Sequence, residues 1–316
     1  MGSGYNFGSG GPFWNGMPML GGHNLVFSTG KSFFVDSSTG SNNNSGLSPS
    51  KPFSTVDYAI GLCIANKGYV IYLMPGHAET VTATSIALDV AGITIVGLGH
   101  GLNRPTFTFG AAAATVTVSA ANCSWYNCVC VANYANVAVG FTVSGKDFVL
   151  TDTLFTDGSS TLDWRTCVAT GAVANCADGL TVVNCTKLGL ASDALAFISI
   201  LEATDRLYVA NNCVTDVATG DVGHFIIMGA FVCAGARILS NALYVTGATT
   251  ATVGVFMTGS STTSTGIVAD NVARSLDTAS ELFMTATLTF ANFRNLYMSN
   301  TGSSGYLAPP IDVLGT

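Results

Sequence analysis

The stretch that decides the fold is Tyr208-Val209-Ala210-Asn211, because a phrase of this kind, apolar residues leading to Asn or Asp, returns along most of the chain. The other copies are Ser124-Trp125-Tyr126-Asn127, Val149-Leu150-Thr151-Asp152, Thr181-Val182-Val183-Asn184, Ile238-Leu239-Ser240-Asn241, Ile267-Val268-Ala269-Asp270 and Tyr297-Met298-Ser299-Asn300. Their Asx residues are 25, 32, 27, 30, 29 and 30 positions apart, a period of about 29. Such a period is typical of a solenoid, in which each repeat packs only on its neighbours.

The residues around each Asx predict two short strands joined by a tight turn. The residue two positions earlier is always apolar, and the residue two positions later mostly is, which is the alternation of a strand with one buried face. Asn and Asp suit the turn because they tolerate the left-handed backbone conformation. A ladder of turn residues is therefore expected at Asn127, Asp152, Asn184, Asn211, Asn241, Asp270 and Asn300.

A third strand is expected 10 to 18 residues before each turn, for example at Phe141-Thr142-Val143 and Phe225-Ile226-Ile227-Met228. Three strands in a repeat of about 29 residues predict an all-β fold, a right-handed single-stranded parallel β-helix of about nine coils. Leucine-rich and ankyrin repeats have similar periods but need helical segments, and the segments between these strands are rich in Gly, Thr and Ser.

The segment before the first coil resembles a known family. Phe34-Val35-Asp36-Ser37-Ser38-Thr39-Gly40-Ser41, Asn44-Ser45-Gly46-Leu47-Ser48-Pro49 and Lys51-Pro52-Phe53-Ser54-Thr55-Val56 resemble the entry to the pectate-lyase-like β-helix superfamily. That resemblance implies a short capping helix from Ser54 or Thr55 to Ile64. The predicted organisation is an N-terminal arm at 1–30, a cap at 31–67, the β-helix at 68–302 and a tail at 303–316.

The composition argues against several classes of function. The chain is 48% hydrophobic and only 9% charged, with a net charge of −7 and scattered Lys and Arg, which argues against nucleic-acid binding. Polar breaks in every apolar run argue against membrane insertion, and the first ten residues do not resemble a signal peptide. The nine cysteines have no metal-ligand spacing and are expected to be reduced core residues.

Catalytic residues are hard to find in the sequence. The resemblance implies polysaccharide lyases, which combine Ca²⁺-binding Asp clusters with an Arg or Lys base, or hydrolases with paired carboxylates. Asp216 and Asp221 come nearest to a pair and are expected in a solvated loop, although Asp193 could join them on one face. His77 and His100 are expected in turns. We therefore predict no catalytic residue, no metal and no cofactor.

The arm suggests a role in assembly. Large apolar side chains are interspersed among its glycines. This pattern fits either a flexible tail or a docking arm whose apolar side chains bind in pockets of a partner, and the docking arm is the favoured interpretation. The expected partner-binding residues are Tyr5, Phe7, Phe13, Trp14, Met17, Met19 and Leu20. The whole resembles β-helical virion proteins of tailed bacteriophages.

This resemblance implies a non-enzymatic capsid decoration or cement protein, assembled in the host cytoplasm as a homotrimer and held by its arm on the major capsid protein or another virion protein. The alternative is a tail spike or adhesin that binds, and even cleaves, a host surface polysaccharide.

Overall fold

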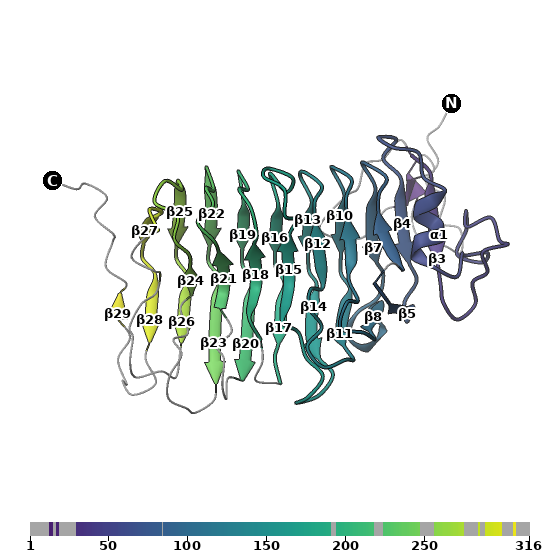
Figure 1. The fold of residues 1–316 in the computed structure, drawn as a ribbon. Helices are drawn as coiled ribbons and strands as arrows, with labels where there is room; N and C mark the ends of the chain where they lie inside the picture. Colours follow the sequence, from purple (N-terminus) through teal and green to yellow (C-terminus); the bar gives the residue numbers. More distant parts are fainter. Residues whose placement is uncertain are drawn as a thin grey trace.

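The computed structural model describes residues 30–83, 85–190, 194–217, 224–246, 256–274, 284 and 288–298, with the main chain alone at 217, 246 and 297–298, and also the main chain of 13–14, 17–18 and 306–307. Three parallel sheets run along the axis of a β-helix, and successive coils lie side by side from the purple end to the yellow end of Figure 1. The predicted fold class is therefore confirmed. Within the described residues, seven coils contribute a strand to all three sheets, and two later coils contribute strands to the first two.

Each sheet collects one strand from each coil. Sheet 1 contains β3 (Ser32–Val35), β4 (Val70–Leu73), β7 (Thr94–Gly97), β10 (Ser124–Tyr126), β13 (Val149–Thr151), β16 (Thr181–Val183), β19 (Tyr208–Ala210), β22 (Ala236–Leu239), β25 (Gly266–Ala269) and β27 (Ala291–Phe293). Sheet 2 contains β5 (Ala78–Val81), β8 (Thr106–Phe109), β11 (Val129–Ala132), β14 (Leu154–Asp157), β17 (Thr186–Leu188), β20 (Cys213–Val217), β23 (Ala242–Thr246), β26 (Val272–Arg274), β28 (Leu296–Met298) and the antiparallel β29 (Tyr306–Leu307). Sheet 3 contains β6 (Ile86–Leu88), β9 (Val116–Val118), β12 (Phe141–Val143), β15 (Thr166–Thr170), β18 (Ala196–Ile200), β21 (His224–Met228) and β24 (Met257–Thr258). Strands β1 (Phe13–Trp14) and β2 (Met17–Pro18) pair with each other in an antiparallel hairpin.

Aromatic rings fill the interior between the sheets. Trp125 contacts Phe107 on one side and Phe141 on the other, with ring centroids 5.0 and 5.4 Å apart. Further along, Phe225 and Phe256 stack at 4.6 Å. Because Phe107 and Trp125 belong to adjacent coils, as do Phe225 and Phe256, burial and ring packing stabilise successive coils jointly.

The turn between sheets 1 and 2 holds a row of residues in the left-handed conformation, with φ between 49° and 57°. Asn127, Asp152, Asn184, Asn211 and Asp270 stand in this row, as the sequence predicts. The prediction for Asn241 is wrong by one position: strand β19 pairs with Arg237–Leu239, so Ser240 is the turn residue of that coil. Arg294 takes the turn in the next coil after Asp270, whereas Asn300 lies outside the described residues.

The residue after the turn points into the core, and from the coil of Asn212 onward it is always asparagine. Asn212, Asn241, Asn271 and Asn295 are at most 1% exposed. The Nδ2 of Asn241 donates to the carbonyl of Val209 at 3.0 Å and to the Oδ1 of Asn271 at 2.9 Å, and its own Oδ1 accepts from the main chain and side chain of Asn212. This asparagine ladder satisfies the buried amide groups of four consecutive coils.

A short helix closes the N-terminal end. Helix α1 (Val56–Gly61) is shorter than the predicted segment and packs on β3, β4 and β6, burying Val56, Ala59 and Ile60. The other helical turn is η1 (Gly101–Asn103), which has 3-10 geometry. Among the described residues no helix has the length and apolar character needed to cross a membrane.

Candidate functional site

A shallow hollow of about 540 Å³ lies on the outside of the corner between sheets 1 and 2. Its floor is formed by three successive members of the turn row, Asn127, Asp152 and Asn184, and its wall by His100, Gly101 and Arg104. The wall residues belong to η1 and its flanks, an insertion that follows β7. Sequence repetition thus supplies the floor, and one irregular loop supplies the wall.

Arg104 ties this loop to the coils. Its Nη2 donates to the carbonyl of Cys128 at 2.9 Å and also to the carbonyl of Asp152, so one guanidinium spans two consecutive coils. Asn127 is oriented by the same loop, because its Nδ2 donates to the carbonyls of Gly97 and Gly99 at 2.9 and 3.1 Å.

The chemistry of the hollow suits hydrogen bonding to a polar ligand. Amide oxygens, one carboxylate, one imidazole and a guanidinium line it. Asp152 is the one acidic residue among them, whereas glycoside hydrolysis needs two carboxyl groups within about 5–9.5 Å of each other. No group of three or more His, Cys, Asp or Glu side chains among the described residues is arranged to hold a metal ion.

Other carboxylates of the chain join one coil to the next. Asp178 accepts the main-chain N–H of Asp205 at 3.0 Å, and Asp205 accepts that of Ala234 at 2.9 Å, one coil further. Burial by itself would raise the pKa of Asp178, but the hydrogen bonds from Asp205 and from the Lys146 ammonium hold it below its ordinary value. These aspartates act as supports for the turn before sheet 1.

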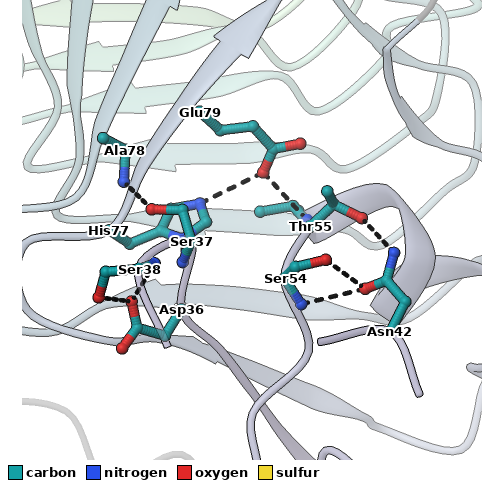
Figure 2. A network of polar contacts seen from close by, with 10 residues as sticks. Asp36, Ser37, Ser38, Asn42, Ser54, Thr55, His77, Ala78 and Glu79 are labelled. Carbon is teal, nitrogen blue, oxygen red and sulfur yellow. Dashed lines mark hydrogen bonds and ion pairs between the residues drawn. The ribbon is translucent and has the colours of Figure 1, made fainter. Parts of the chain in front are cut away.

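A second polar network joins the cap to the first coil (Figure 2). The Nδ1 of His77 accepts the N–H of Ser37 at 3.0 Å, and its Nε2 lies 3.2 Å from Glu79. The same Glu79 oxygen accepts the N–H of Val56 at 3.0 Å, at the start of α1, where Thr55 makes no side-chain cap. His77 is fully buried, so its interpretation as an ordinary turn residue is incomplete: it links the first coil to the cap.

A buried ion pair lies in the interior. Lys187 in β17 and Asp216 in β20 lie on adjacent strands, with Nζ and Oδ2 2.7 Å apart and side chains 1% and 3% exposed. The prediction of a solvated loop for Asp216 is therefore wrong. Burial lowers the pKa of Lys187, but the combined effect of its neighbours, led by the carboxylate of Asp216, is larger, and the net direction is upward. Asp193 and Asp221 lie outside the described residues, so the possible cluster with Asp216 stays untested.

Lys187 was overlooked in the sequence, although a signal was present. It stands three residues after the turn residue Asn184, a position that holds Cys130, Phe155 and Val214 in other coils. A charged residue at a position that is apolar in the other coils indicates a buried polar group.

The cysteines and the arm complete the comparison with the sequence. All nine cysteines are free; burial raises the pKa of Cys233 to about 11 and that of Cys185 to about 12, so both thiols stay protonated at neutral pH. In the arm, the strand pairing places Trp14 opposite Met17 and Phe13 opposite Pro18. Tyr5, Phe7, Met19 and Leu20 lie outside the described residues.

Comparison with known proteins adds little to this chemistry. No family model matches the chain, and no curated protein matches it by sequence. Among solved structures, a rhamnogalacturonan lyase is similar at 14% identity with a TM-score of 0.45, over 87% of this chain and 75% of that one. A likeness of this size carries no argument about activity, so the function has to be sought in the residues of the chain itself.

Proposed function

We propose that this chain is a non-enzymatic structural protein of a bacteriophage virion, a capsid decoration protein that is attached through its N-terminal arm and exposes its β-helix. The proposal that the protein is not an enzyme rests on the hydrogen bonds that its acidic side chains accept. Main-chain N–H groups from other segments are accepted by Asp57, Glu79, Asp157, Asp163, Asp178 and Asp205. Carboxylates held in this way maintain the coils and do not face a substrate.

The virion assignment rests on the aromatic, glycine-rich arm and on the largely uncharged body. Exposed apolar side chains continue onto the outer faces of the sheets, with Ile267 43% and Phe293 53% exposed on sheet 1, and Leu188 and Tyr244 exposed on sheet 2. Surfaces of this kind favour association with further copies, and a trimer is the proposed state.

The hollow supports a second candidate, binding of a host surface glycan. Three amide or carboxylate side chains spaced one coil apart present hydrogen-bonding groups at intervals of about 4.8 Å, a repeating array that suits a repeating polymer. Arg104 adds a positive charge that suits an acidic sugar. In this candidate the protein holds a polysaccharide at the corner without cleaving it.

A reducing-end assay with uronate-containing and capsular polysaccharides tests the non-enzymatic proposal. We expect no turnover by the full-length chain. Turnover that is lost in Asp152→Asn, but kept in the matched surface variant Asp147→Asn, would overturn it and assign catalysis to the hollow. Retention on a glycan array without turnover, reduced at least tenfold by Asp152→Asn or Asn184→Ala, would favour the second candidate.

A further inference from the structure

An amine and a carboxylate face each other inside the β-helix. Lys187 and Asp216 lie on neighbouring parallel strands, and the register places Lys187 directly opposite Val214, two residues before Asp216. The two charged atoms are 2.7 Å apart, and both side chains are almost fully buried. This places a nucleophile in near-contact with a carboxyl group at a position that bulk water does not reach.

Aromatic side chains line one side of the pair. Opposite Lys187 on its other side stands Phe155, whose ring lies 5.7 Å from Trp164 and 6.2 Å from Phe197. Two charges in such a place carry a large desolvation cost, which an ion pair offsets only in part. A reaction that removes both charges relieves this cost, so the environment favours a neutral product.

Two further features position the reacting groups. Asp157 ends β14, and its charge acts on Lys187. Its oxygens are fixed by the N–H groups of Trp164 at 3.1 Å and Leu190 at 2.8 Å. Gly189 leaves the space that Asp216 occupies, since a Cβ there would come within 2.3 Å of the Asp216 Oδ1. The reacting carboxyl group is therefore held in place, and a second, fixed carboxylate acts on the amine through its charge.

We propose that Lys187 and Asp216 condense to an intramolecular amide cross-link. The Lys187 ammonium gives one proton to the Asp216 carboxylate, and the neutral Nζ attacks Cγ of the protonated Asp216. As the new C–N bond forms, Nζ gives a second proton to Asp157, which passes it to the departing hydroxyl group as the C–O bond breaks, and one water molecule leaves. Nothing is oxidised or reduced, and no cofactor takes part. The inference is independent of the proposed function.

Intact-mass spectrometry of the full-length chain, reduced and denatured, tests the cross-link. We expect a mass lower than the sequence mass by one water molecule, and after proteolysis a branched peptide that contains both Lys187 and Asp216. A full sequence mass, together with a Lys187 side chain that reacts with an acylating reagent after denaturation, would overturn the proposal without any variant.

Variants assign the roles. Lys187→Met and Asp216→Ala should have their own full sequence masses. Lys146→Met is the matched control, because Lys146 also lies 3.0 Å from a carboxylate, that of Asp178, but is 53% exposed; it should still lack one water. Asp157→Asn, checked for folding by circular dichroism, should keep the water. A cross-link that forms at the normal rate in Asp157→Asn would refute Asp157 as the proton carrier.

Discussion

At the scale of single residues, the turn row shows what the left-handed conformation demands. Asparagine and aspartate fill it in five coils, but Ser240 and Arg294 also adopt positive φ, at 56° and 49°. A residue without a local side-chain partner is strained there by about 1 kcal/mol relative to Asn or Gly. The row is therefore not equally relaxed along its length.

This difference predicts a stabilising substitution. Ser240→Asn should raise the free energy of unfolding by about 0.5–1 kcal/mol, because Asn tolerates the conformation and residue 240 is exposed. The reciprocal change Asn211→Ser, at an exposed turn of φ 57°, should lower it by a similar amount. Denaturant unfolding measures both, and equal midpoints for Ser240→Asn and the parent chain would contradict the assignment.

The same residues show where the sequence was informative and where it was not. Both Ile238 and Leu239 are apolar, so alternation alone does not decide which one points inward. The deciding feature is the asparagine that follows the turn in the later coils, and Asn241 aligns with Asn212 and Asn271 only if Ser240 is the turn residue. The turn residue that follows Asp270 along the row is Arg294. Arginine has no preference for the left-handed conformation, so the sequence pattern points to Asn300 instead.

At the scale of elements, the strands of sheets 1 and 2 were predictable because their side chains alternate about a marked turn. Strands β12 and β21 of sheet 3 also lie where the sequence placed them. The polar contacts were less accessible: Glu79 reaches α1 across 23 residues and Lys187 meets Asp216 across 29. Such pairs depend on how neighbouring coils are aligned with each other, and this alignment cannot be read from a single sequence.

The register of β22 can be tested directly. Ile238→Asp should unfold the chain or lower its stability by more than about 3 kcal/mol, because an unpaired carboxylate would be buried in a core position that is 0% exposed. Leu239→Asp is the matched control: it faces outward and is half-buried, so its cost should stay near 1 kcal/mol. Thermal melts compare the two, and the opposite ranking would place Leu239 inside.

At the scale of the whole molecule, the body has its own cap. Strand β3, helix α1 and the His77–Glu79 network close the first coil without residues 1–29. Removing 1–29 should therefore leave the melting temperature within about 2 °C of the full-length value while abolishing incorporation into virus particles. Phe13→Ala combined with Trp14→Ala should weaken incorporation in the same direction.

Light scattering and a particle pull-down measure these outcomes. The full-length chain is expected at the mass of a trimer, and the truncated chain is expected to be folded but absent from the particles. If the truncated chain still occupied the particles fully, the attachment would have to be made by the outer faces of the sheets and not by the arm.

The asparagine ladder has a consequence for engineering. The inner rungs, Asn241 and Asn271, each donate to the coil before and to the rung after, and accept from the rung before, so the contacts that leave one of these coils are the same as those that enter the next. A duplicated segment from Asn212 to Ser240 would therefore bring its own matching donor and acceptor. The number of coils, and with it the length of the β-helix, could therefore be changed by copying this segment without redesigning the ends of the chain.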